Sequence, residues 1–181
     1  LVAMISAIPG IRDLAMTTNG ILLSDHAYEL KAAGLHRVNI SLDTTDPEEF
    51  RRITRGGDIR RVLEGIRAAR QAGLLPVKLN CVVSDSSSEP NALLVKELAE
   101  KEEVEVRFIH QMDLATGQYS VVEGGEGGHC ARCNRLRLTA NGMVKPCLFD
   151  AIGFSVREHG ARQALLLAVA NKPACGTVNH D

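Results

Sequence analysis

The chain has 181 residues, of which 45% are hydrophobic and 24% are charged, a composition typical of soluble globular proteins rather than disordered or fibrous ones. The formal net charge of -1 argues against a protein that mainly coats nucleic acid or an anionic membrane, so any anion site is expected to be local. The longest apolar runs fall short of the roughly 18 residues that a membrane-spanning helix needs, so no membrane segment is predicted.

The first residues, LVAMISAIPG, lack the basic flank and the small-residue cleavage pattern of a signal peptide. They are expected to be the end of a helix that runs into Pro9 and Gly10. Because the chain does not begin with methionine, we expect a fragment whose N-terminal part is missing.

Strands and helices are predicted to alternate along the first 110 residues. Short β-branched or apolar runs predict strands over 14–18, 37–42, 77–83 and 104–110. Helix-period runs predict helices over 25–33, 47–54, 59–72 and 91–101. Such alternation favours an α/β fold with parallel pairing through right-handed crossovers. The pattern alone leaves both an open doubly wound sheet and a barrel possible, and no glycine-rich dinucleotide or P-loop motif follows any strand.

The organisation changes after Met112, and we predict a boundary there, with a β/α domain over 1–112 and a second region over 113–181. A glycine-rich loop comes first. Alternation over 135–139 and 143–147, joined by the turn 140–142, predicts a β-hairpin. A helix is expected over 156–168, broken at residues 159–160.

Three of the five cysteines, Cys130, Cys133 and Cys147, lie close together in the sequence. Nothing indicates secretion, so a reducing cytoplasm with thiolates serving as metal ligands is expected. Cys81 lies in an apolar strand pattern and is predicted to be a buried small hydrophobe. Cys175, in the polar tail, is predicted to be a free surface thiol.

The predicted hairpin returns Cys147 toward the other two thiols, so that three thiolates are expected to converge. Zinc in a structural site prefers four ligands, and His129 is awkwardly placed to be the fourth. A four-iron cluster held by three cysteines leaves one iron open to a small molecule. From the spacing alone, a zinc site and an iron–sulfur cluster are equally favoured. Thiols that bind no metal are a less favoured third interpretation.

Basic residues in strand patterns are candidates for anion binding. Arg135 and Arg137 are two apart on a predicted strand and therefore leave the same face. They suit phosphate or carboxylate groups, although in isolation a solvated hairpin face is the favoured interpretation, and only a neighbouring open metal site shifts the balance. Lys78, a lone base in an apolar strand, either snorkels at a strand end or points into a barrel mouth.

Five segments, taken in chain order, carry a resemblance to a known family: AMTTNG, RVNISLD, VKLNCVV, VRFIHQMD and HCARCNRLRLTANGMVKPCLF. Together they closely resemble the radical S-adenosylmethionine (SAM) GTP 3′,8-cyclase family of molybdenum cofactor biosynthesis, over about residues 10–150. The resemblance implies a portion of a partial (β/α)6 radical SAM barrel, followed by a β-hairpin iron–sulfur region and a C-terminal helix. It moves the metal assignment toward a 4Fe-4S cluster.

The resemblance also implies a substrate-side cluster and its neighbours. Cys130, Cys133 and Cys147 correspond to its ligands, and Arg135 and Arg137 to residues near the nucleotide. The implied substrate is GTP, a small-molecule partner, and the implied function is that of a cyclase or lyase.

Four further positions match the family's motifs. Thr17 and Lys78 are expected to face GTP, the lysine toward its triphosphate. Ser41 and Met112 are expected to line the pocket for S-adenosylmethionine. Without the resemblance, the hydroxyls of Thr17 and Ser41 read equally well as ordinary strand-end groups, and Met112 as a core residue.

The chain departs from the family in three respects. No CxxxCxxC motif occurs, so the chain as given is expected to lack the cluster that generates the radical. The interval from Met112 to Cys130 is shorter than in the family, and the family's C-terminal Gly-Gly is absent. Two alternatives therefore stay open: a related radical SAM enzyme with a different substrate, and a non-catalytic iron–sulfur or zinc domain.

Overall fold

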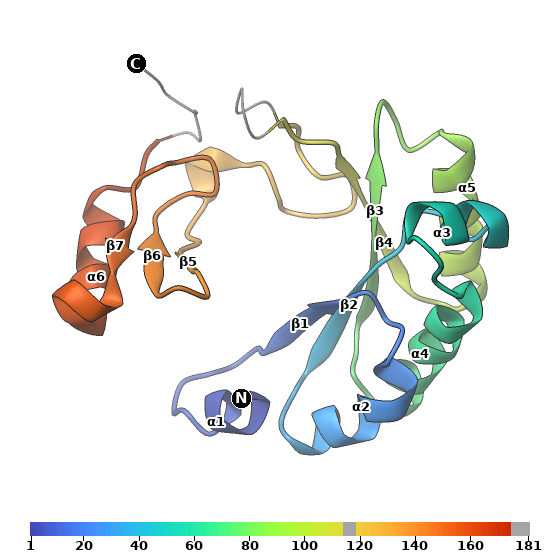
Figure 1. Ribbon diagram of the computed structural model, residues 1–181, viewed down its shortest axis with the longest axis horizontal. Coiled ribbons are helices and arrows are strands. Elements are labelled where there is room, and N and C mark those ends of the chain that lie inside the picture. The colour runs from blue at the N-terminus through green and yellow to red at the C-terminus, as the bar shows by residue number, and fades with distance from the viewer. Residues whose placement is uncertain (114–118, 175–181) are drawn as a thin grey trace. The chain divides into compact units, whose positions relative to one another are not determined.

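The computed structural model describes residues 1–113 and 119–174, and it confirms the predicted alternation of strands and helices (Figure 1). Every element predicted between residues 14 and 110 is present, with bounds that differ by no more than two residues. The elements in chain order are α1 (Val2–Ser6), β1 (Ala15–Thr18), α2 (Leu23–Ala32), β2 (Arg37–Ser41), α3 (Pro47–Ile53), α4 (Ile59–Gln71), β3 (Val77–Val83), α5 (Pro90–Lys101) and β4 (Glu105–His110).

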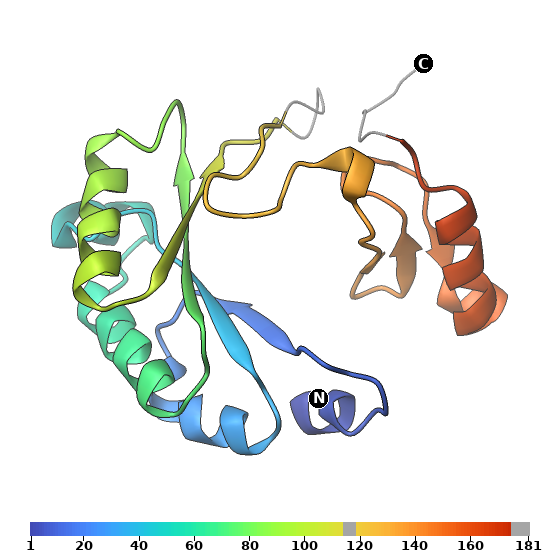
Figure 2. The same ribbon diagram turned by 180° about the vertical axis from the view of Figure 1, so that it is seen from behind.

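The four strands form one parallel sheet in the order β1-β2-β3-β4. Helices α2, α4 and α5 lie together on one side of this sheet in both views (Figures 1 and 2). Parallel strands joined by helices on a single face are the arrangement of a (β/α) barrel segment. The predicted α/β class is therefore confirmed, and a flat doubly wound sheet with helices on both faces is not what forms.

The core lies between the sheet and its helices. Strand β3 has the burial pattern of strict alternation, with Val77, Leu79, Cys81 and Val83 buried. Because successive strand residues point to opposite faces, these four side chains all meet the helices. The helical side of the same core is supplied mainly by α4, whose buried residues are Ile59, Val62, Gly65, Ile66 and Ala69.

Helix α4 begins where its sequence predicts. Asp58 caps the helix, its carboxylate accepting from the backbone N–H of Arg60 at 3.0 Å. Side-chain caps of this kind satisfy one of the free amides of the first turn. Gly73 follows the helix with a φ of 75°, a conformation that glycine adopts without strain.

Gly65 places α4 directly against the turn that follows β1. A Cβ at this position would lie 2.4 Å from the Gly20 carbonyl oxygen. Alanine ordinarily favours a helix over glycine by about 1 kcal/mol, but overpacking costs about 1–3 kcal/mol. Because the contact is with a backbone atom, which cannot rotate away as a side chain could, the overpacking cost should lie at the upper end, about 2–3 kcal/mol. We therefore expect Gly65→Ala to lower the free energy of unfolding by about 1–2 kcal/mol in urea denaturation. Gln71→Ala, exposed on the same helix, is the control; a Gly65→Ala protein as stable as wild type would contradict this close packing.

After β4 the chain divides into two compact units. Residues Val122–Gly125 return to the first unit, which otherwise comprises Leu1–Gln111. The return is made through paired backbone hydrogen bonds of 3.0 Å each between Phe108 and Glu123. The second unit comprises Met112–Val121 and the chain from Glu126 onward.

The second unit contains the predicted hairpin and helix. Strands β5 (Arg137–Leu138) and β6 (Met143–Lys145) pair antiparallel, with Arg137 opposite Lys145, and β7 (Phe154–Ser155) extends the sheet. The strands are shorter than predicted, in part because Pro146 has no N–H to donate to the ladder. The second unit also contains the short helix η1 (Cys130–Arg132) and the helix α6 (Val156–Ala170), which is interrupted at Gly160 as predicted.

A small core joins the hairpin to α6, with Val144, Ala164 and Ala168 buried. Lys172 also ties the base of the hairpin, donating from Nζ to the carbonyl oxygens of Arg135 at 2.7 Å and Pro146 at 2.8 Å. None of the helices in the described part of the chain combines the length and the apolar character needed to cross a membrane.

Candidate functional site

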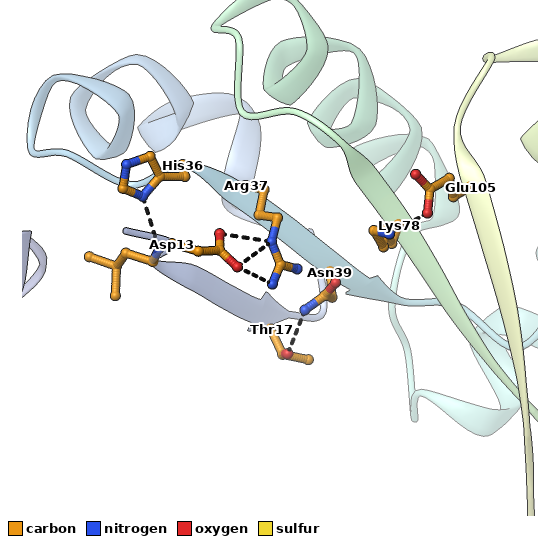
Figure 3. Close-up of polar contacts among 8 residues, drawn as sticks. Asp13, Thr17, His36, Arg37, Asn39, Lys78 and Glu105 are labelled. Carbon is orange, nitrogen blue, oxygen red and sulfur yellow. Dashed lines mark hydrogen bonds and ion pairs between the residues drawn. The ribbon is translucent and has the colours of Figure 1, made fainter. Parts of the chain in front are cut away.

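The face of the parallel sheet opposite its helices carries a row of polar side chains. Strand register places Thr17 beside Asn39, Asn39 beside Lys78, and Lys78 beside Glu105. Figure 3 shows these four side chains along β1, β2, β3 and β4. A parallel sheet with both faces covered by helices would be apolar on both, so this polar row marks a face adapted to something other than helix packing.

Two ion pairs lie on this face (Figure 3). The Lys78 ammonium contacts the Glu105 carboxylate. The Arg37 guanidinium contacts Asp13 through Nε at 2.9 and 3.0 Å and through Nη2 at 2.6 Å. The hydrogen bond from Arg37 holds the pKa of Asp13 below its usual value. Each of these two cations thus has a carboxylate partner, and the second pair is the more rigidly held because it is bidentate.

Three buried polar atoms on the same face have no hydrogen-bond partner within the described residues. They are Oδ1 of Asn39, Oδ1 of Asn80 and Nε of Arg107. Asn39 uses its other amide atom, Nδ2, which donates to Thr17 Oγ1 at 3.4 Å. A buried acceptor or donor left unpaired costs about 1–3 kcal/mol, which a bound ligand with matching groups would recover.

The structure places the predicted residues of the first unit on this polar face. Thr17 and Ser41 are exposed near the carboxyl ends of β1 and β2. Lys78 is the second residue of β3, and register rather than position along the strand brings it level with Thr17. The next row, Ser41 beside Asn80 and Asn80 beside Arg107, continues the face.

Sequence reasoning missed Asn39, Asn80, Arg107 and Glu105. The sequence does contain a signal for residues of this kind: two residues that are two positions apart on a strand lie on the same face of the sheet. Asn80 is two residues from Lys78, and Arg107 is two residues from Glu105. What the spacing does not show is which residues of different strands are neighbours.

The second unit holds the three clustered cysteines. Cys130 begins η1, and the N–H of Cys133 donates to the Cys130 carbonyl at 3.0 Å. Cys147 follows β6 immediately after Pro146. All three cysteines are at least partly exposed. Three cysteine thiols on irregular backbone are a chemically suitable donor set for an iron–sulfur cluster with one iron left open.

The structure does not itself gather these thiols around an ion. Within residues 1–113 and 119–174, no group of three or more His, Cys, Asp or Glu side chains is placed to hold a metal ion. The thiolates of a four-iron cluster bind different irons, whereas the ligands of zinc converge on one atom. The assignment of Cys130, Cys133 and Cys147 to a cluster therefore stays a prediction.

Tyr119 is a neighbour of the cysteines that sequence reasoning missed. Its hydroxyl contacts the Sγ of Cys130. Its ring stacks on Phe149, with ring centroids 4.8 Å apart and an interplanar angle of 18°. Tyr119 therefore connects the Cys130 turn with the segment that follows Cys147.

The two hairpin arginines differ in their surroundings. Strand β5 begins at Arg137, so Arg135 lies before the strand and is exposed. Arg137 is half-buried, and its Nε is buried without a hydrogen-bond partner in the described part of the chain. Of the two, Arg137 has the unsatisfied donor that an anionic or carbonyl-bearing ligand would bind.

Met112, Cys81 and Cys175 are the remaining residues that the sequence singled out. Met112 lies in the second unit, directly after Gln111, with 37% of its surface exposed. Cys81 is fully buried, as predicted, and burial raises the pKa of its thiol to about 12, which leaves it protonated. Cys175 lies outside the described residues.

Comparisons with known proteins match both halves of the chain. The Radical SAM superfamily model matches residues 1–89. GTP 3′,8-cyclases from Moorella thermoacetica, Peptoclostridium acidaminophilum and Alkaliphilus oremlandii are 39%, 36% and 36% identical to the chain. These matches cover 82%, 96% and 95% of the chain and 60%, 68% and 69% of the three enzymes. The chain thus spans only part of the length of these relatives, 60% in the case of the Moorella enzyme.

Among solved structures, the coproporphyrinogen III oxidase of Escherichia coli, a radical SAM enzyme, is 18% identical to the chain. The match has a TM-score of 0.40 and covers 54% of the chain and 23% of that protein.

Proposed function

Because the chain belongs to the GTP 3′,8-cyclase family of radical SAM enzymes, we propose that it is part of an enzyme that rearranges GTP in molybdenum cofactor biosynthesis. The observation that carries this proposal is the polar face of the parallel sheet. It combines an ammonium group with buried amide oxygens that have no hydrogen-bond partner among residues 1–113 and 119–174. A nucleotide has both matching chemistries: anionic phosphates, and the N–H and O–H donors of its base and ribose.

In this proposal the polar face binds the nucleotide. Lys78 binds the triphosphate, because an ammonium is a compact point charge suited to phosphate oxygens. Thr17 orients the ligand from the neighbouring strand, with its hydroxyl held by Asn39. The buried Oδ1 atoms of Asn39 and Asn80 accept from ligand donors and so recover the cost of their burial.

The remaining predicted residues take the roles implied by their positions in the family's motifs. Ser41 and Met112 bind S-adenosylmethionine, the hydroxyl through hydrogen bonds and the thioether through apolar contact. Arg135 and Arg137 bind the nucleotide through charge-assisted hydrogen bonds.

Cys130, Cys133 and Cys147 hold a 4Fe-4S cluster in this proposal, with residues 113–181 as the cluster region. When bound, the iron–sulfur and S-adenosylmethionine cofactors of this family supply radical chemistry and an open iron for a substrate atom. The protein's own part is to bind and orient the nucleotide. A reducing cytoplasm would keep these cysteines in the thiol form that binds iron.

The test is calorimetric titration of anaerobically reconstituted protein with GTP, guanosine and inorganic triphosphate. We expect saturable binding of GTP that is tighter than binding of either part, because the polar face offers partners both to the phosphates and to the nucleoside. Protein with its cluster intact that does not bind GTP would reject GTP as the substrate, and would favour a radical SAM enzyme acting on another molecule.

A second expectation concerns S-adenosylmethionine. The 181-residue chain has no CxxxCxxC motif, and a three-cysteine motif of this kind anchors the cluster that cleaves S-adenosylmethionine in the family. We expect the reconstituted and reduced chain to form no 5′-deoxyadenosine above background, measured by chromatography of the quenched reaction. Formation of 5′-deoxyadenosine in amounts exceeding the protein would show that other residues of the chain serve this purpose.

A further inference from the structure

We propose that Glu105 is the built-in counter-ion of the anion subsite at Lys78, and that polyphosphate binds there by replacing its carboxylate. The inference rests on the proposed function, since that function assigns Lys78 to the triphosphate. It adds a residue with a specific electrostatic role. Glu105 weakens the binding of every anion at Lys78, so that only a highly charged ligand displaces its carboxylate and fills the subsite.

The geometry of the pair supports an exchangeable contact. Lys78 lies on β3 with 16% of its side chain exposed, and Glu105 lies on β4, the last strand of the sheet, with 52% exposed. Strand register places the two residues side by side, so the contact forms without any turn or loop holding it. The half-exposed carboxylate can move into water at small cost, whereas the largely covered ammonium stays on the polar face.

The pair is coupled electrostatically to the second ion pair on this face. The pKa of Asp13 is lowered chiefly by the hydrogen bond from Arg37, and to a smaller extent by the charge of Lys78. The pKa of Arg37 is raised chiefly by its hydrogen bond to Asp13, and less by the charge of Glu105. The charges of Lys78 and Glu105 therefore shift the pKa values of Asp13 and Arg37 across this face. Loss of the Glu105 charge leaves the four-residue group with a net positive charge.

The second pair explains why the subsite is at Lys78 rather than at Arg37. Arg37 makes three contacts with Asp13, at 2.6 to 3.0 Å, in bidentate geometry. Such a pair is more costly to separate than a single ammonium–carboxylate contact. An incoming phosphate therefore competes more readily with Glu105 than with Asp13.

The experiment compares wild type with Glu105→Gln, which preserves the shape of the side chain and removes its charge. Each protein is titrated with inorganic triphosphate, GTP and guanosine. We expect Glu105→Gln to bind triphosphate and GTP about two- to fivefold more tightly, and guanosine unchanged. The gain is expected to shrink as salt concentration rises, because it arises from charge. A purely structural role for Glu105 would not produce this dependence on ligand charge and salt.

Two further variants make the assignment specific. In a Lys78→Met background, Glu105→Gln should no longer strengthen triphosphate binding, because the double-mutant cycle isolates the pair. Glu100→Gln is the matched control: it is the same chemical change at an exposed position on α5, the helix that packs on the core side of the sheet. It should leave all three affinities unchanged. Urea denaturation of each variant checks that the fold is retained.

The inference is overturned if Glu105→Gln binds triphosphate no more tightly than wild type, if guanosine gains equally, or if the gain survives in the Lys78→Met background. Absence of triphosphate binding by both proteins would likewise overturn it, because no anion subsite would then exist at Lys78. A different result is expected if the proposed function is wrong and the inference about Glu105 is right. In that case wild type binds triphosphate but not GTP, and the effect of Glu105 is still measurable with triphosphate.

Discussion

Anaerobically reconstituted protein is expected to contain about four iron and four sulfide ions per chain, and the triple variant Cys130→Ala, Cys133→Ala, Cys147→Ala essentially none. The expectation follows from the chemistry of the thiols. These three thiols are at least partly exposed and lie in one unit, so that iron can reach them. Loss of all three removes every protein ligand that the proposal gives to the cluster.

Cys81→Ala is the matched control for this loss. Its thiol is fully buried in the core of the other unit, and its raised pKa opposes formation of the thiolate that binds metal. It should keep the full iron and sulfide content and the cluster absorption. Unchanged iron in the triple variant would contradict the cysteine assignment. Bound zinc with no uptake of iron would instead favour a structural zinc site.

Arg137→Ala is expected to weaken GTP binding by about 1.5–3 kcal/mol, or roughly tenfold to hundredfold. Its Nε is a buried donor without a hydrogen-bond partner in the described residues, so a ligand oxygen would gain a charge-assisted hydrogen bond there. The measurement is calorimetric titration with GTP, with cluster content determined for each protein. Arg135→Ala belongs in the same series, since the family's motif implies a similar role for it.

Arg157→Ala provides the control, because Arg157 is exposed in the first turn of α6, within the same unit. It should bind GTP as wild type does. If Arg137→Ala and Arg135→Ala also bind GTP with wild-type affinity while their clusters are intact, both residues belong to a solvated hairpin face. The shorter interval between Met112 and Cys130 would then favour a different substrate.

The local sequence was sufficient to predict most elements of the first unit. Strand β3 occupies Val77–Val83 as predicted, because its apolar residues alternate strictly with other residues. Asp58 identifies the start of α4 because a carboxylate can cap only the amides next to it. Gly160 identifies the break in α6, where φ is 74°. Each of these features depends on residues within a few positions of one another.

The motifs also indicated which residues carry chemistry, but not how they are arranged. The spacing of Cys130, Cys133 and Cys147 predicted a metal site, and the hairpin between them forms with shorter strands than predicted. It did not predict β7, which has two residues and is too short for any periodicity to appear. Nor did it predict that Tyr119 contacts Cys130 and stacks on Phe149, because that contact depends on how the loop folds.

The sequence by itself determined that this chain has alternating strands and helices, three cysteines close together in the sequence, and basic residues in otherwise apolar strands. Only the tertiary structure decided which polar groups are neighbours. Lys78 and Glu105 are 27 positions apart, and the register of β3 against β4 brings them together. Register is set by the packing of a whole strand, whose alternate side chains must meet the helices, and a shift of one residue would turn Lys78 into the core. Short stretches of sequence thus indicate which residues belong to the site, whereas the register of the sheet determines which of them are paired.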